Sequence, residues 1–167
     1  SKGGVSGGTR IGGLIGRNIG EIINSYSISN VDGSFNEIGG LVGYNEGGSI
    51  SYSYARGIVN GEERIGGLVG LNDQSGTITN SYSTGTVQGT ADVGGLIGVN
   101  GSTIELSYWD IESSEQSNAV GRGNSEGTSG LTTSEMTGTS AEQNMTGFDW
   151  TDIWVTTDSY PVLFWEE

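Results

Sequence analysis

Aliphatic residues and glycines are interleaved in one short phrase that occurs four times along the chain. The third copy covers residues 65–72 and reads IGGLVGLN. The copies begin at Ile11, Ile38, Ile65 and Val93, so their starts are 27, 27 and 28 residues apart. A fixed period in the range of roughly 20 to 50 residues is typical of solenoids and other stacked repeats. The pattern therefore predicts a repeat protein.

The four copies also agree downstream of the phrase. Each has an isoleucine, then a Ser-Tyr pair, and the first three then have a valine. The isoleucines are Ile22, Ile50, Ile78 and Ile104, the tyrosines are Tyr26, Tyr54, Tyr82 and Tyr108, and the valines are Val31, Val59 and Val87. Residues 1–10 match the end of a repeat, with Val5 at the valine position. We therefore assign repeats to residues 1–108, with a half-repeat at 1–10, and expect further repeats of the same polypeptide upstream.

Within each repeat the pattern predicts three short strands, which in the third copy are residues 65–71, 77–83 and 85–88. The second of these alternates with period two and would place Ile78, Asn80 and Tyr82 on one face. Helices are disfavoured because each glycine in a helix interior costs about 1 kcal/mol relative to alanine. The sequence predicts an all-β fold, a parallel β-helix or β-solenoid of about four coils of ~27 residues.

Stacked coils place equal positions above one another, so the repeats predict ladders of identical side chains. Two aliphatic ladders are expected inside the solenoid, one of Leu14, Leu41, Leu68 and Leu96 and one of Val5, Val31, Val59 and Val87. The asparagines that close the phrase are Asn18, Asn45, Asn72 and Asn100. We expect them at a corner, with left-handed backbone angles and hydrogen bonds to one another.

The repeat resembles the GLUG motif of bacterial and archaeal surface proteins, which is named for a Gly-Leu-hydrophobic-Gly core. That core occupies residues 40–43 and 67–70, and the continuation at residues 80–87 is also similar. The resemblance covers about residues 3–108. It implies an extracellular, non-catalytic module of a larger, adhesin-like cell-surface protein. The alternatives are a passive stalk or spacer and an accessory domain of a secreted peptidase or polysaccharide-active enzyme.

Residues 109–167 have a different character. All four tryptophans of the chain lie there, at Trp109, Trp150, Trp154 and Trp165, and the phrase does not return. Residues 110–130 are polar and rich in Gly and Ser, which predicts a long surface loop. Residues 153–155 and 160–165 are apolar enough to pack. Since a solenoid must cover its last coil, we expect 109–167 to be a loop followed by an aromatic-rich C-terminal cap over the open end.

Composition narrows the classes of function. The formal net charge is −14 and Lys2 is the single lysine, so nucleic acids and anionic membranes are disfavoured as partners. The chain has neither cysteine nor histidine, which removes thiolate metal sites and the commonest general base. No apolar run is long enough to insert into a membrane.

Few residues suggest chemistry. Asp73 and Asp92 break the repeat pattern as a carboxylate pair of a glycosidase would, but turns favour Asp for its backbone hydrogen bonds, and no enzyme activity is expected. The acids Asp110, Glu112 and Glu115 cluster where the repeats end and are candidates for calcium. Their spacing lacks the glycine-containing loop of an EF-hand, so no cofactor is expected, with calcium as the alternative.

Aromatic residues are the candidates for ligand binding. Tyr44 and Tyr52 are aromatic only in the second repeat, and Trp109 begins the C-terminal part. Such rings can stack on sugars. The alternative is that the tryptophans form the small core of the cap. Two roles stay open on this sequence, a module that binds glycans or a neighbouring cell surface and a passive stalk.

Overall fold

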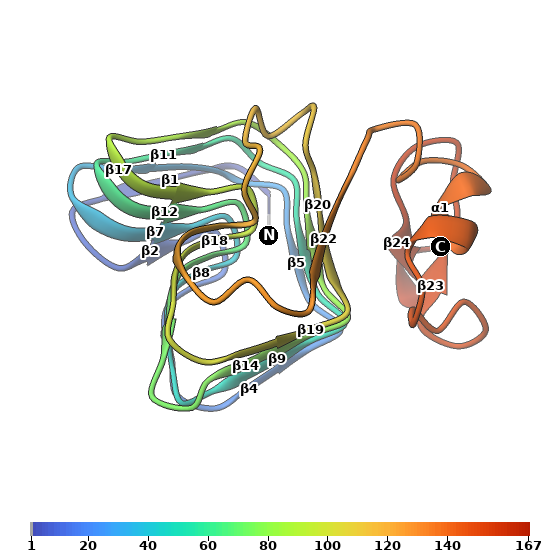
Figure 1. Cartoon of the computed structure of the whole chain (residues 1–167), viewed down its shortest axis with the longest axis horizontal. Helices are drawn as coiled ribbons and strands as arrows, with labels where there is room; N and C mark the ends of the chain where they lie inside the picture. Colours follow the sequence, from blue (N-terminus) through green and yellow to red (C-terminus); the bar gives the residue numbers. More distant parts are fainter. Residues whose placement is uncertain (1) are drawn as a thin grey trace.

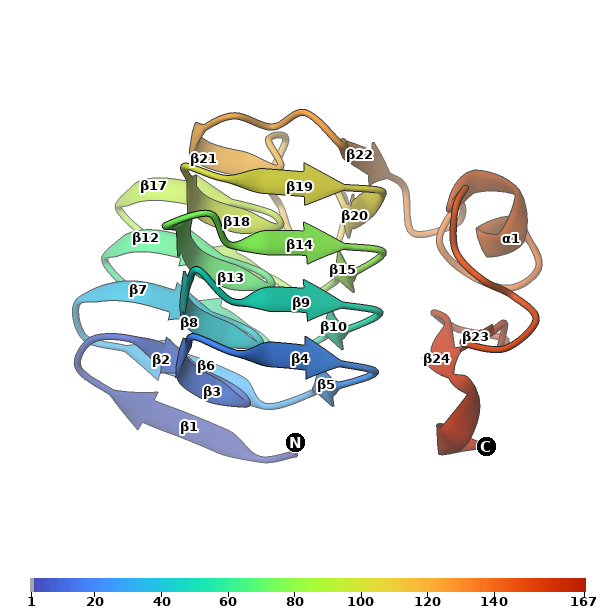
Figure 2. The same cartoon turned by 90° about the horizontal axis from the view of Figure 1, so that it is seen from below.

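The computed structural model describes residues 2–167, of which residues 4–131 form a parallel β-solenoid (Figures 1 and 2). Four coils stack in register and a shorter fifth follows them. Five parallel sheets, here named A to E, run along the stack, and each coil contributes one short strand to each sheet in turn. The predicted all-β solenoid of about four coils is confirmed.

Sheets A, B and C contain the strands before and within the repeated phrase. Sheet A consists of β1 (Gly4–Gly7), β6 (Asn30–Gly33), β11 (Val59–Asn60) and β16 (Val87–Gln88). Sheet B consists of β2 (Ile11–Gly12), β7 (Asn36–Gly39), β12 (Glu63–Gly66) and β17 (Ala91–Gly94). Sheet C consists of β3 (Ile15–Asn18), β8 (Val42–Glu46), β13 (Val69–Asp73), β18 (Ile97–Asn100) and β21 (Val120–Gly123).

Sheets D and E contain the isoleucine and tyrosine positions of the repeats. Sheet D consists of β4 (Glu21–Ile23), β9 (Ser49–Ser51), β14 (Thr77–Thr79) and β19 (Thr103–Glu105). Sheet E consists of β5 (Tyr26–Ser27), β10 (Tyr54–Ala55), β15 (Tyr82–Ser83), β20 (Ser107–Asp110) and β22 (Thr128–Leu131). The remaining elements are α1 (Ser140–Asn144), the antiparallel pair β23 (Trp154–Val155) and β24 (Val162–Leu163), and the 3-10 helix η1 (Phe164–Glu166).

Each coil has five strands, so the expectation of three is wrong. Two predicted strands are each divided by a bend: residues 65–71 fall into β12 and β13, and residues 77–83 fall into β14 and β15. Asn80, in the second bend, has φ of 46°. This left-handed corner sends Ile78 into the interior and Tyr82 to the outside, so the two do not share a face.

The interior is divided into two apolar columns. The larger lies among sheets C, D and E and contains Leu41, Leu68 and Leu96, all fully buried. The amides of successive leucines donate to one another's carbonyls, as from Leu41 to Leu68 at 2.9 Å. Leu14 stands at the end of this ladder and is 40% exposed, because its outer side has no coil above it.

The second column is smaller and lies between sheets A and B. It contains the valine ladder, in which Val5 pairs with Val31, Val31 with Val59 and Val59 with Val87. The isoleucines Ile38 and Ile65 pack against these valines. Both predicted aliphatic ladders are therefore present.

The asparagine ladder is also present. Asn18 donates to Asn45, Asn45 to Asn72 and Asn72 to Asn100, each from Nδ2 to Oδ1 at 2.8 Å, and all four side chains are buried. The left-handed backbone expected there is wrong, because these residues are the last or last but one of extended strands of sheet C and do not have positive φ. Their side chains point inward and also bond the following turn, as from Asn45 Nδ2 to the Gly48 carbonyl at 2.9 Å.

Glycines form the contact between the two columns. In every coil the strand of sheet C folds back against sheet B, which gives the cross-section its waist (Figure 1). A Cβ on Gly70 would lie 2.5 Å from the Ile38 nitrogen and 2.6 Å from the Glu37 carbonyl carbon. Only glycine lets the backbones of the two sheets approach this closely.

The repeats continue past residue 108 into a partial fifth coil. Strand β20 spans that boundary, β21 pairs with β18, and β22 pairs with β20. The Ala119 carbonyl takes the place of the next leucine and accepts hydrogen bonds from Leu96 and Ile97 at 2.9 Å. The long surface loop expected at 110–130 is therefore wrong, since part of it is paired with the solenoid.

The C-terminal segment, residues 132–167, lies along the flank of the solenoid and not over its end (Figure 2). It starts beside the last coils, where Tyr108 bonds the Thr146 carbonyl, and reaches the first coil, where Trp165 Nε1 bonds the Asn24 carbonyl at 3.2 Å. The prediction of a cap over the open end is wrong. The solenoid presents tyrosines on the outside of sheet E along its length, and this apolar strip is what the segment covers.

Across residues 2–167, none of the helices reaches the length and apolar character that crossing a bilayer requires.

The waist makes a testable prediction. Gly70→Ala places a methyl group into the backbone of sheet B and is expected to lower the free energy of unfolding by about 3 kcal/mol, because the sheets must separate. The matched control is Gly20→Ala, where a Cβ meets nothing within 4 Å, and which should change stability by at most about 1 kcal/mol. Urea denaturation followed by circular dichroism measures both, and equal effects would contradict the close approach.

Candidate functional site

The most elaborate set of contacts joins the C-terminal segment to the tyrosine ladder, which consists of Tyr26, Tyr54, Tyr82 and Tyr108 on the outside of sheet E. The ring centroids of Tyr26 and Tyr54 are 5.1 Å apart, those of Tyr54 and Tyr82 are 5.0 Å apart, and both pairs are stacked at 8°. Trp154 covers the rings of Tyr54 and Tyr82 at 6.1 and 5.5 Å. The ladder is thus an aromatic strip that is already occupied.

The tyrosine hydroxyls fix the segment at three points. Tyr54 donates to the Glu166 carboxylate at 2.9 Å, Tyr82 to the Pro161 carbonyl, and Tyr108 to the Thr146 carbonyl at 2.6 Å. Burial raises the pKa of Tyr54 and of Tyr82 well above the usual range, so both stay protonated donors at neutral pH. Each hydroxyl therefore holds a different stretch of the segment.

Arg56 is the cation of this interface. Its guanidinium lies 4.5 Å from the Tyr54 ring centroid, 5.7 Å from that of Tyr82 and 5.5 Å from that of Tyr160. It also donates to the Tyr82 hydroxyl and to the Pro161 carbonyl. Such cation–π contacts are worth about 0.5–2 kcal/mol each, more when the cation is desolvated. Arg56 therefore binds the ladder and the segment at once.

Asp110 also connects the solenoid to the C-terminal segment through hydrogen bonds. Its buried carboxylate accepts hydrogen bonds from Thr133 Oγ1 at 2.6 Å, from Tyr160 Oη at 2.5 Å, and from the amides of Glu112 and Ser113. Burial acts to raise the pKa of Asp110, but the hydrogen bonds from Thr133, Tyr160, Ser113 and Glu112 together hold it below the usual range. The carboxylate is thus a structural acceptor.

Two of the three calcium candidates accept hydrogen bonds from within the chain. Asp110 uses both carboxylate oxygens for the bonds above, and Glu112 Oε2 accepts from the Thr133 amide at 2.8 Å. Glu115 is exposed, with φ of 59°. The part of the chain that the structure describes holds no group of three or more acidic side chains arranged for a metal ion. The geometry gives calcium binding no support.

The aromatic candidates are mostly withdrawn from solvent. Trp109 is 7% exposed, lies in the larger apolar column and donates from Nε1 to the Gln116 carbonyl at 3.0 Å, so it is not a platform for sugars. Tyr44 is 8% exposed under the Arg10 guanidinium, 5.2 Å from its ring centroid, and burial raises the pKa of its hydroxyl. Tyr52 is partly buried against the cluster that the tyrosine ladder forms with the C-terminal segment. The three residues form no common patch.

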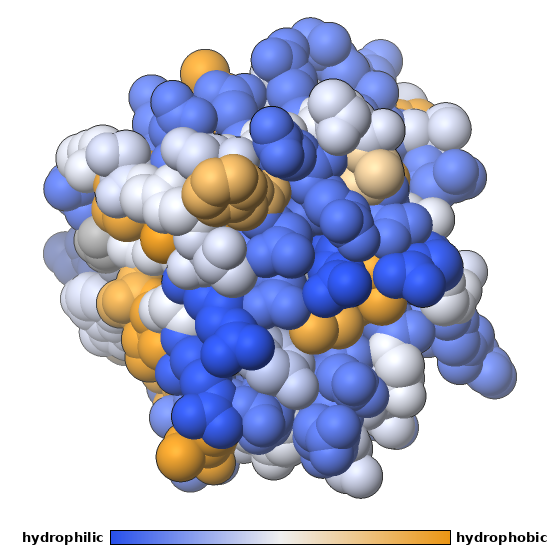
Figure 3. Space-filling view, turned by 90° about the vertical axis from the view of Figure 1, so that its left-hand side faces the viewer, coloured by the Kyte–Doolittle hydropathy of each residue, from blue (hydrophilic) through white to orange (hydrophobic). Residues whose placement is uncertain are grey.

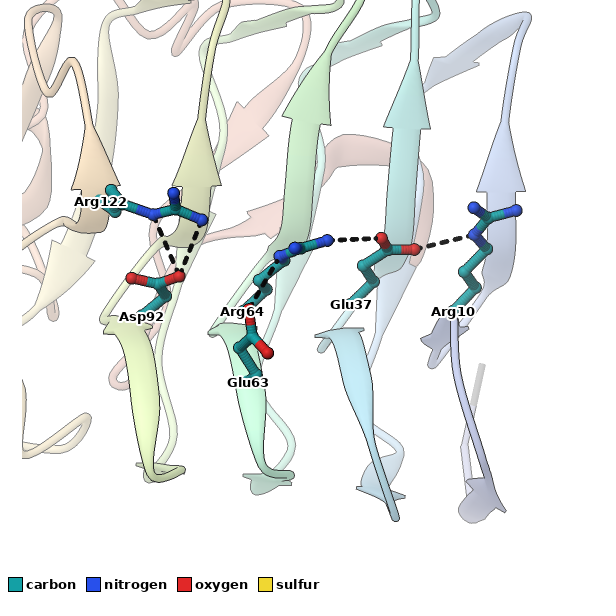
Figure 4. A network of polar contacts seen from close by, with 6 residues as sticks. All are labelled: Arg10, Glu37, Glu63, Arg64, Asp92 and Arg122. Carbon is teal, nitrogen blue, oxygen red and sulfur yellow. Dashed lines mark hydrogen bonds and ion pairs between the residues drawn. The ribbon is translucent and has the colours of Figure 1, made fainter.

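Charged residues form a ladder that runs across the strands of sheet B (Figure 4). The residue before the phrase is left-handed in all four coils, with φ between 52° and 63°, and its charge alternates: Arg10, Glu37, Arg64 and Asp92. The nearly buried Glu37 carboxylate accepts from Arg10 at 2.8 Å and from Arg64 at 3.0 Å. Asp92 pairs with Arg122 at 3.0 Å. Asp92 in β17 is therefore engaged in an ion pair, and Asp73 is the last residue of β13 in sheet C.

The sequence contains a sign of the interface between the tyrosine ladder and the C-terminal segment, but the sequence analysis did not identify it. The Ser-Tyr pair recurs in every repeat, but its direction depends on the left-handed corner two residues before the tyrosine. That corner holds Asn24, Tyr52, Asn80 and Leu106, which are of three different residue types. Arg56 is likewise an irregularity, because Ile28 and Thr84 stand at its position in the neighbouring coils. An unmatched arginine beside a repeated tyrosine was the available clue.

The tyrosine interface predicts the effect of one hydroxyl. Tyr82→Phe removes the donor to Pro161 and the acceptor for Arg56, and we expect a loss of about 1–2 kcal/mol in the free energy of unfolding. Tyr52→Phe is the control, because among residues 2–167 its hydroxyl has no hydrogen-bond partner. Urea denaturation gives the values, and limited proteolysis should cut residues 132–167 faster in the first variant. An unchanged proteolysis rate would argue against the interface.

Asp110 predicts a dependence on pH. Its pKa is lower in the folded chain than the value of about 3.9 for an unfolded aspartate, so its charged form stabilises the fold above about pH 4. This contribution is lost as the pH falls through the folded pKa. We expect Asp110→Asn to be less stable at pH 7 and to lose less stability than the native chain between pH 5 and pH 2. Parallel profiles of unfolding free energy against pH would contradict the assignment.

Comparison with protein families identifies the repeats. The family model described as the GLUG motif matches residues 7–32, 36–60 and 61–88. The three matches follow one another along the first three coils, with junctions in the turns around sheet A. Comparison with curated proteins finds no match, and comparison with solved structures finds none either.

Proposed function

Residues 7–88 are repeats of the GLUG family, and on this premise we propose that the chain is a non-catalytic, extracellular module of a larger surface protein, with a role in adhesion. The family match supports a repeat module. The extracellular location and the adhesive role are proposed because the repeats resemble those of adhesin-like cell-surface proteins.

The observation that carries the proposal is the in-register stacking of the coils. Leucine, valine and asparagine ladders run through the stack and make a stiff column with a repeated exterior. The acids that break the repeat are used in ion pairs or turns, as Asp92 is with Arg122. An arrangement of this kind suits the presentation of surfaces better than the positioning of reacting groups.

A passive stalk is the second candidate, and the burial of the aromatic candidates favours it. Trp109 and Tyr44 are buried, and the tyrosine ladder is covered by the C-terminal segment. On the side of sheets A and B, polar side chains predominate and apolar ones are scattered (Figure 3). Phe35, with 59% of its surface accessible, is an exposed aromatic residue of the solenoid that a ligand could contact.

The two roles are separated by a binding experiment. The purified chain is applied to a broad glycan array and to whole cells, with calcium and with a chelator. Adhesion predicts specific binding that falls at least about fivefold in Phe35→Ala if the solenoid face carries it. Phe164→Ala is the matched control, because Phe164 is 62% exposed on the C-terminal segment. A folded sample that binds neither glycans nor cells would overturn the adhesive role and leave the stalk.

A further inference from the structure

The fifth coil departs from the repeat at the end of the larger apolar column. Its strand β21 begins at Val120, which pairs with Ile97 of β18. In the first four coils the three residues before this strand are Gly-Gly-Leu, whereas in the fifth they are Ser117, Asn118 and Ala119. The leucine that fills the column is thus an alanine here, and two polar side chains stand where the other coils have glycine.

A pocket of about 290 Å³ lies at this end of the column. Its lining includes the apolar residues Trp109, Ala119 and Val120 and the polar residues Ser117, Asn118 and Ser125. The fifth coil faces the viewer in Figure 1, and the C-terminal segment lies to its side. Since that segment covers the flank of the solenoid, it leaves the pocket at this end open.

The backbone around the pocket is held in place by hydrogen bonds. The Asn118 carbonyl accepts from the Gly95 amide at 2.9 Å, which ties it to the fourth coil. On the opposite side, Thr128 Oγ1 donates to the Ser125 carbonyl at 2.7 Å. The lining is therefore arranged before a ligand arrives, and less entropy is lost when one binds.

The polar side chains of the rim have their hydrogen-bonding capacity left. Within residues 2–167, no hydrogen bond engages the Ser117 hydroxyl, the Asn118 amide or the Ser125 hydroxyl. A hydroxyl and a carboxamide can each donate and accept. None of the lining residues is charged, so the pocket has no group that would balance an ionic ligand. The rim therefore suits a neutral ligand with several hydroxyls.

The floor of the pocket is apolar. It consists of Trp109, Ala119 and Val120, of which 7%, 4% and 8% are exposed. The ring of Trp109 is packed inside the column, so it closes the floor and offers no open face for stacking. One face of a sugar ring carries C–H groups, which can rest on such a floor while the hydroxyls reach the rim. Pockets for drug-sized ligands measure roughly 300–1,000 Å³, so this one has room for one sugar unit.

We propose that this pocket binds a single neutral sugar unit, with Ser117, Asn118 and Ser125 as hydrogen-bonding partners of its hydroxyls. The inference rests on the proposed adhesive role and gives that role a class of ligand and a place at the end of the stack. The dissociation constant is expected on the order of 1–10 mM, because the pocket is small and open.

The test is a titration of the full ¹⁵N-labelled chain with the methyl glycosides of glucose, galactose, mannose and N-acetylglucosamine, followed by NMR. We expect at least one of them to give saturable shifts centred on the amides of Ser117, Asn118 and Ser125. Asn118→Ala should weaken binding at least about fivefold, because a group that both donates and accepts is lost. Ser129→Ala, exposed on β22 and outside the lining, is the control with unchanged binding.

A second variant tests the origin of the pocket. Ala119→Leu restores the leucine of the other coils and is expected to fill the floor, so binding should disappear while the NMR spectrum remains that of a folded chain. Undiminished binding by this variant overturns the proposal. So does the absence of a saturable shift at Ser117 and Asn118 with all four glycosides up to about 100 mM, an affinity too weak for recognition.

Whole-cell binding separates this site from the adhesive role. Cell binding that survives Asn118→Ala keeps the adhesive role and overturns the pocket as its site. Glycoside binding at Asn118 by a chain that binds no cells keeps the pocket and overturns the adhesive role.

Discussion

The structure depends on one constraint, that equal positions of successive coils lie directly above one another. The glycines of the phrase make the constraint strict, because sheets B and C touch through their backbones and tolerate no side chain at Gly70. The asparagine ladder enforces it from within, since each Nδ2 must meet an Oδ1 of the next coil in a buried place. A slip by one residue would turn every buried side chain of a strand to the opposite face.

The in-register stacking of the coils also explains why the solenoid needs the C-terminal segment as a cover. Parallel stacking repeats whatever stands on the outside as faithfully as it repeats the core, so one outward tyrosine per coil becomes a continuous aromatic strip. The segment covers this strip with Phe148 and Trp154 and is held by Arg56 and Asp110. Its aromatic content reflects a flank that must be covered along the whole length of the stack.

The period of the sequence was enough to predict the solenoid and its interior ladders, but it did not predict the partial fifth coil, which lacks the repeated phrase. Corners were harder, because a left-handed residue can be Asn80 in one coil and Leu106 in the next without changing the path of the chain. The strand count and the direction of the tyrosines depend on those corners, and both predictions were wrong. The position of Trp109 has a related explanation. Trp109 breaks the repeat pattern because it fills the end of a core column, where a shorter coil leaves room for a large ring.

The charged ladder bears on how such an array can grow by gene duplication. Neighbouring coils carry opposite charges at the corner before the phrase, from Arg10 through Glu37 and Arg64 to Asp92. Copying a single coil in tandem would set two like charges side by side. A copy of the coil that contains Glu37, for example, would place a second carboxylate next to the nearly buried carboxylate of Glu37. Copying two coils together preserves the alternation at both junctions. The charge pattern of this corner thus repeats every two coils, which is twice the period of the apolar phrase.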